Sequence, residues 1–120
     1  MRWPRSGRML YLTNGFSPGM IGEKGERWGN VARFEFRTLR PREAGNLLRE
    51  NRFVSCFGHR DTAWHLSRYL KVEIPVSRES IVPGPDDLIL IASAKHVRTY
   101  HKGFLGAPRW CFYLVRRISK

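Results

Sequence analysis

The stretch FVSCFGHRDTAWHLSRYL, residues 53–70, decides the fold that the sequence predicts. The apolar run 53–57 is continuous enough to form a strand inside a sheet. Gly58 ends the run, and over 60–70 apolar residues return at helical spacing. The stretch therefore predicts a strand, a glycine turn and a helix in direct succession.

Further strands and a second helix are predicted on both sides of this unit. Pro41 suits a first helical turn, and the apolar stripe behind it predicts a helix that ends near Asn51. Pro75 cannot donate to a strand ladder, so its segment is expected to be irregular or an edge strand. Apolar runs predict strands at 9–14, 31–39 (half-buried), 88–94 and 110–118. This order indicates an α/β fold with a mixed sheet of about five strands and flanking helices.

The length of 120 residues suits one domain, which we expect to comprise residues 9–120. Residues 1–8, MRWPRSGR, are expected to be a flexible basic N-terminal extension. No stretch approaches the ~18 apolar residues of a membrane span, and the N-terminus lacks the apolar segment of a secretory signal. We therefore expect a cytoplasmic protein with no membrane partner. Because the cytoplasm keeps thiols reduced, we expect Cys56 and Cys111 to be buried, reduced thiols.

The charge balance is strongly basic. The chain has 22 Lys and Arg against 10 Asp and Glu, a net charge of +12. Such a charge favours a polyanionic partner. Because the basic residues are spread along the chain, duplex DNA, RNA, a small phosphorylated ligand and mere solubility all remain open. Acidic residues are sparse, which argues against metal-dependent chemistry. The sequence also lacks a Gly-Lys-Ser/Thr phosphate loop, which argues against nucleoside-triphosphate chemistry.

Gly58 and His59 stand where a strand passes into a helix, a position suited to phosphate. The first helical N–H groups and the helix dipole attract anions there, and Gly58 allows close backbone approach. His59, if protonated, could give its proton to the oxygen that leaves a phosphodiester. The alternative is that His59 is a helix cap or an ordinary surface residue.

Three motifs together resemble a known family. LYLTNGFS (10–17), FVSCFGHRDTAWHLSRYLKVEIPVSRESI (53–81) and PDDLILI (85–91) are similar to segments of the viral ring nucleases, the type III anti-CRISPR proteins that degrade cyclic tetra-adenylate. The resemblance implies a metal-independent homodimer without a cofactor. It also implies cleavage to linear adenylates with 2′,3′-cyclic phosphate ends, which removes the second messenger of CRISPR defence.

The resemblance assigns roles to individual residues. His59 matches the general acid, Asn14 and Ser17 match a turn that lines the ligand pocket, and Arg78 matches an arginine that approaches the ligand. The segment KHVRTYHKG (95–103) departs from the family, which has an arginine and then a glutamate before a glycine. Lys95 or Arg98 would take the part of the arginine, and no residue replaces the glutamate.

Two hypotheses about function follow. The first is a ring nuclease that binds cyclic tetra-adenylate and has no stable long nucleic-acid partner. The second is a non-catalytic binding protein, either a sink for cyclic oligoadenylate or a small basic protein that binds DNA or RNA. The missing acidic residue in 95–103 favours the sink within this second class.

Overall fold

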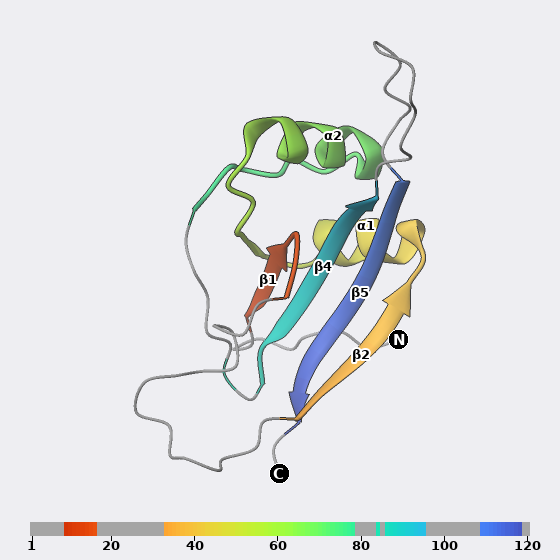
Figure 1. Ribbon diagram of the computed structural model, residues 1–120, viewed down its shortest axis with the longest axis vertical. Helices are drawn as coiled ribbons and strands as arrows, with labels where there is room; N and C mark the ends of the chain where they lie inside the picture. Colours follow the sequence, from red (N-terminus) through yellow and green to blue (C-terminus); the bar gives the residue numbers. More distant parts are fainter. Residues whose placement is uncertain (1–8, 17–32, 79–83, 85, 96–108, 119–120) are drawn as a thin grey trace.

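Two helices cover one face of a five-stranded mixed sheet in the computed structural model (Figure 1). The structure describes residues 9–16, 33–78, 84, 86–95 and 109–118. The predicted strands and helices are all present in the predicted order, and the expected extension 1–8 lies outside the described residues. The elements are β1 (Leu10–Thr13), β2 (Arg33–Leu39), α1 (Pro41–Glu50), β3 (Val54–Ser55), α2 (Arg60–Leu70), β4 (Leu88–Lys95) and β5 (Arg109–Ile118).

The sheet has the strand order β2-β5-β4-β1-β3 and combines parallel and antiparallel pairs. β1 runs parallel to both β3 and β4, whereas β5 is antiparallel to β4 and β2. In this register Leu12 of β1 stands opposite Ser55 on one side and Leu90 on the other. The carboxyl ends of β1, β3 and β4 therefore point toward the same edge of the sheet.

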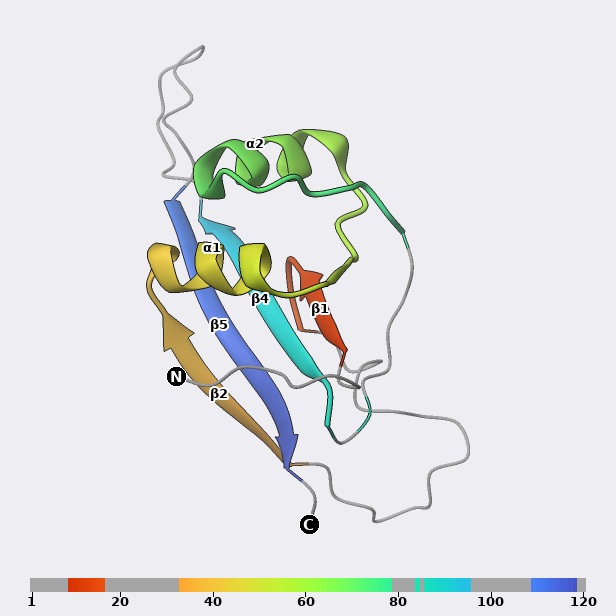
Figure 2. The same ribbon diagram turned by 180° about the vertical axis from the view of Figure 1, so that it is seen from behind.

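Both helices pack on the same face of the sheet (Figure 2). α1 begins with Pro41 at its first position, and the Arg40 N–H donates to Glu43 Oε1 at 2.9 Å. The buried residues of the helices are Ala44, Gly45, Leu47 and Leu48 in α1 and Ala63, Leu66 and Leu70 in α2. They meet alternate side chains of the central strands, such as Leu90 and Phe112. Each leucine fully removed from water contributes roughly 1.5–3 kcal/mol to stability.

The opposite face of the sheet carries a smaller apolar cluster around Ile89, Ile91 and Val115. After β1 the chain turns back over this face, and Phe16 packs edge-on against Phe34 of β2 with ring centroids 5.1 Å apart. The turn after β1 is thereby fixed to the helix-free side of the sheet.

Three details of the sequence-based prediction are wrong. β3 has two residues and, among the described strands, lies at an edge of the sheet, because Phe57 leaves the strand direction and enters the core beneath the helices. β2 is mostly exposed rather than half-buried, with Phe36 52% exposed. Among the described strands it pairs with β5 alone, and its one buried residue is Leu39, at the end next to α1. Cys56 and Cys111 are free thiols but only partly buried.

The segment that carries Pro75 is irregular over its described residues 71–78, as predicted. Within the described part of the chain, neither helix has the length and apolar character needed to cross a membrane.

Candidate active site

The candidate site lies at the edge where the parallel strands β1, β3 and β4 end. In open α/β sheets this carboxyl edge is where the connecting loops form ligand sites. Asn14 directly follows β1, the loop 56–59 directly follows β3, and Lys95 is the last residue of β4. The topology therefore brings to one edge residues that are far apart in the sequence.

The loop between β3 and α2 is anchored to β1 and to the core. The Cys56 N–H donates to Leu12 O at 2.7 Å, which joins the loop to β1. Phe57 is fully buried, and its N–H donates to Ser55 Oγ at 3.3 Å. The loop is therefore tied to the core directly before it reaches Gly58 and His59.

His59 occupies the N-cap position of α2. Its backbone is extended, with φ −112° and ψ 125°, and its carbonyl accepts the first helical hydrogen bond from Ala63 N at 3.0 Å. Its side chain makes no capping hydrogen bond and is exposed. The helix thus uses the backbone of His59 as its cap and leaves the imidazole outside the capping interactions, where it can reach a ligand.

Arg78 lies directly on Gly58. A Cβ atom placed on Gly58 would stand 3.2 Å from Arg78 Cγ and 3.8 Å from Ser77 O. The Ser77 N–H donates to Phe57 O at 2.8 Å, so the two segments run side by side here. Gly58 therefore makes room for the arginine stem, and the exposed Arg78 is brought next to the loop that carries His59.

The turn after β1 lies at the same edge of the sheet. Asn14 is exposed, and Thr13 Oγ1 beside it donates to Gly15 O at 3.2 Å. This local hydrogen bond is typical of the turn chemistry that Thr and Gly provide. Asn14 therefore stands at the same strand edge as His59, whereas Ser17 lies outside the described residues.

The basic residues predicted in β4 and beyond are placed only in part. Lys95 ends β4 and pairs with Arg109, the first residue of β5. β1 ends level with Ile91, so Lys95 lies about 13 Å further along the strand direction. Lys95 thus shares the edge but stands beyond the end of β1, and Arg98 lies outside the described residues.

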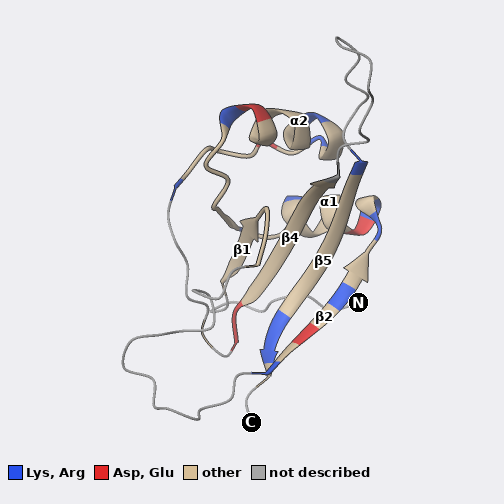
Figure 3. Ribbon diagram, viewed as in Figure 1, with Lys and Arg blue, Asp and Glu red and all other residues tan. Residues whose placement is uncertain are grey.

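The charges around this edge favour an anion. Figure 3 shows basic positions at the start of α2 and in the segment that follows α2, beside the largely uncharged middle of the sheet. Arg60 and Arg78 are both exposed there, with Asp61 as the acidic neighbour in the first helical turn. Within the described residues, no three His, Cys, Asp or Glu side chains gather as they would around a metal ion.

Sequence reasoning missed the residues that bring Arg78 back to the site. Ser67 in α2 accepts a backbone hydrogen bond from Val72 N through its carbonyl and another from Ile74 N through its Oγ, both at 3.1 Å. Lys71 ends α2 in the left-handed conformation, with φ 59°. These contacts reverse the chain along the helix, and no local pattern in the sequence identifies them.

Comparison with known proteins gives a family and a fold. The model of the STIV B116-like family matches residues 10–103, which include the positions of Asn14, Gly58, His59, Arg78, Lys95 and Arg98. Among solved structures, B116 of Sulfolobus turreted icosahedral virus has a TM-score of 0.66 at 16% sequence identity, over 90% of this chain and 98% of that chain. No curated protein matches the sequence. The chain therefore belongs to the STIV B116-like family, which is named for a viral protein.

Proposed function

We propose that this protein is a metal-independent ring nuclease that cleaves cyclic tetra-adenylate, with His59 as the general acid. The observation that carries the proposal is the placement of an exposed His59 at the start of α2, beside Arg78 and at the carboxyl edge of three parallel strands. Such an edge, with a helix N-terminus and cationic side chains, suits a phosphodiester. Membership of a family named for a viral protein agrees with this proposal.

The reaction needs one proton donor and good alignment. A ribose 2′-oxygen attacks the neighbouring phosphorus, the bond from phosphorus to the 5′-oxygen breaks, and the protonated imidazole of His59 gives its proton to that oxygen. The 2′-hydroxyl proton passes to water, and His59 takes up a new proton from water. The products are linear adenylates with a 2′,3′-cyclic phosphate at one end and a 5′-hydroxyl at the other.

Arg78 and Asn14 hold the ring in this proposal. The Arg78 guanidinium would pair with a phosphate, and the Asn14 amide would contact the ring from the turn after β1. Alignment of the 2′-oxygen with the bond to be broken replaces much of what a separate base would supply, since positioning can lower a barrier by several kcal/mol. A single histidine is therefore enough.

The same proposal includes a homodimer. His59, Arg78 and Asn14 are all exposed on one protomer, so one copy leaves the ligand open to solvent. A ring of four equal units has two-fold symmetry, which a symmetric pair of protomers matches. Two copies facing each other would enclose the ring and present two His59 side chains to opposite phosphates. Removal of the ring would switch off type III CRISPR defence.

The test is incubation of the purified protein with cyclic tetra-adenylate in EDTA, with the products separated by chromatography and identified by mass spectrometry. We expect linear adenylates with 2′,3′-cyclic phosphate ends. Loss of all cleavage in EDTA, with recovery on adding a divalent cation, would contradict the metal-independent mechanism.

A non-catalytic sink for cyclic oligoadenylate is the second candidate. It is favoured by the segment 95–103, which contains no acidic residue. A sink would retain the intact ring through gel filtration and release it unchanged. A binder of long nucleic acid would instead be competed equally by linear RNA or duplex DNA, with affinity that falls steeply as salt rises.

A further inference from the structure

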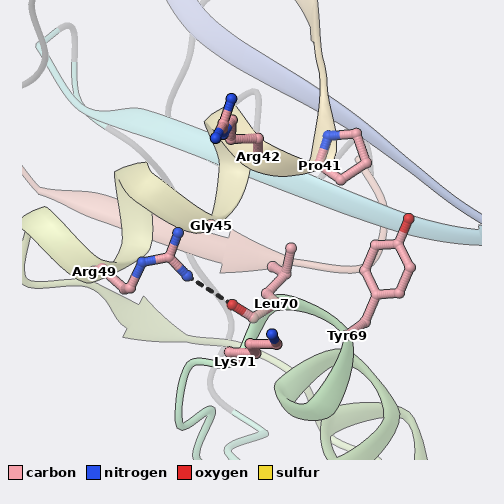
Figure 4. Close-up of a pocket in the computed structure, with 7 residues that line it drawn as sticks. All are labelled: Pro41, Arg42, Gly45, Arg49, Tyr69, Leu70 and Lys71. Carbon is pink, nitrogen blue, oxygen red and sulfur yellow. Dashed lines mark hydrogen bonds between the residues drawn. The ribbon is translucent and has the colours of Figure 1, made fainter.

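A pocket lies between α1 and the end of α2 (Figure 4). Its volume is about 350 Å³. Its walls come from one side of α1, from Pro41 to Arg49, and from the end of α2 with the cap residue Lys71. His59 stands at the opposite end of α2, whose 11 residues span roughly 16 Å. The pocket is therefore separate from the candidate active site.

Three basic side chains line this pocket: Arg42, Arg49 and Lys71. No carboxylate is among the lining residues that the structure describes. Glu43 lies nearby in α1, but its carboxylate accepts the hydrogen bond from Arg40 N at the start of the helix. The three cations outweigh the partial negative charge at the carboxyl end of α2, so the pocket has a net positive charge that favours an anion.

The Arg49 guanidinium is fixed in place. Its Nη1 donates to Leu70 O at 2.7 Å, and its Nη2 donates to Asn46 Oδ1 at 2.6 Å. A Cβ atom on Gly45 would stand 3.1 Å from Nη1 and 3.2 Å from Nη2, so the glycine provides the space that the guanidinium occupies. A fixed guanidinium loses little side-chain entropy when it binds an anion.

An aromatic ring forms another wall. Tyr69 stacks on Phe112 with ring centroids 6.3 Å apart and planes at 21°, and Phe112 stacks in turn on Trp110 at 6.5 Å. Tyr69 is nevertheless 48% exposed and lies on the opposite side of the pocket from Arg49 in Figure 4. Stacking on Phe112 thus holds the Tyr69 ring in place, and the exposed part of the ring remains available for a flat ligand.

We propose that this pocket binds a small phosphate that carries a flat ring, of the nucleoside monophosphate class. Arg49 holds the phosphate together with Arg42 and Lys71, and the base packs against Tyr69. This inference does not depend on the proposed nuclease activity, because the residues and the location are different.

The test is an NMR titration of the ¹⁵N-labelled full-length protein with adenosine monophosphate, adenosine and inorganic phosphate in parallel at constant ionic strength. We expect saturable shifts at the amides of Gly45 and Leu70, with the monophosphate binding more tightly than adenosine or phosphate. Shifts confined to Gly58 and Ser77 would place the ligand at the other site and overturn the inference. Phosphate binding as tight as that of the monophosphate would overturn the nucleotide assignment.

Two variants test the pocket cations without touching the core of the fold. Arg42→Gln removes one cation from an exposed position, and Lys71→Gly removes another while relieving a left-handed backbone. Each is expected to weaken monophosphate binding about tenfold, the scale of a charge-assisted hydrogen bond. Arg33→Gln makes the same charge change on exposed β2, outside the pocket, and is expected to weaken binding by less than about twofold. Equal weakening by Arg33→Gln would show that only net charge matters and would overturn the site.

Discussion

The side chain of Arg78 lies against Gly58, with Cγ 3.2 Å from the point where a Cβ atom would stand at residue 58. The hydrogen bond from Ser77 N to Phe57 O, at 2.8 Å, holds the two segments together at this contact. Because Gly58 directly precedes His59, the contact joins the arginine and the histidine of the proposed site.

Gly58→Ala tests this contact. The added methyl group would stand 3.2 Å from Arg78 Cγ, so the arginine side chain must move by a few tenths of an ångström. Because Arg78 is exposed and its side chain can move, we expect the free energy of unfolding to fall by no more than about 1 kcal/mol, whereas KM for the ring should rise. Urea unfolding and steady-state cleavage measure the two effects.

Gly15→Ala is the matched control for stability, because among the described residues no atom beyond its chain neighbours lies within 4 Å of a Cβ at that residue. If Gly58→Ala left both KM and the free energy of unfolding unchanged, the contact would have no part in positioning Arg78.

His59→Ala is expected to lower the cleavage rate by ~10²–10⁴-fold, the usual contribution of a general acid. Binding of the ring should largely remain, since Arg78 and Asn14 hold the ring in the proposed complex and both are unchanged. Rapid-quench assays give the rate, and fluorescence anisotropy with a labelled ring gives the affinity.

His65→Ala is the control on the same helix. His65 is exposed and packs edge-on against Trp64, with ring centroids 5.0 Å apart. The His65→Ala variant should cleave the ring at the same rate as the unsubstituted protein. Undiminished cleavage by His59→Ala would remove His59 from the chemistry.

Ser67→Ala should affect the site from a distance. It removes the hydrogen bond between Ser67 Oγ and Ile74 N, so stability should fall by about 1 kcal/mol. The returning segment that carries Arg78 should also loosen, which raises KM while kcat changes little. Ser67→Thr retains a hydroxyl and should restore KM, and an equal rise of KM in both variants would contradict this positioning role.

Lys71→Gly should stabilise the fold. Lys71 adopts φ 59° and ψ 44°, a conformation that costs a residue with a Cβ roughly 1–2 kcal/mol and costs glycine little. We therefore expect the free energy of unfolding to rise by about 1 kcal/mol in urea titrations. Lys71→Ala keeps the Cβ and should bring no such gain, so equal stabilisation by both would rule out relief of the backbone as the cause.

The order of strands and helices was predictable because each depends on local patterns. Alternation and apolar runs identified the five strands, Pro41 marked the start of α1, and Gly58 marked the break before α2. The position of His59 at the start of α2 followed from the same local reading, and its catalytic role stays a prediction.

The remaining features depend on contacts between distant segments. Nothing near residues 53–57 shows that Phe57 turns into the core and leaves β3 with two residues. The pairing of Gly58 with Arg78 requires a reversal after α2 that begins at Ser67. Gly45 was the available signal for the pocket between the helices, since a glycine inside a helix weakens it and is often kept for close approach.

The burial of Phe57 directly before Gly58 and His59 links local opening of the site to global unfolding. The Cys56 amide is bonded to Leu12 and the Phe57 side chain is fully enclosed, so the loop cannot leave its place unless the core opens. In native-state hydrogen exchange, the Cys56 amide should therefore exchange with a free energy close to that of unfolding the whole chain. The loop before the histidine would then be among the slowest parts of the protein to open, although a loop at the surface is ordinarily among the fastest.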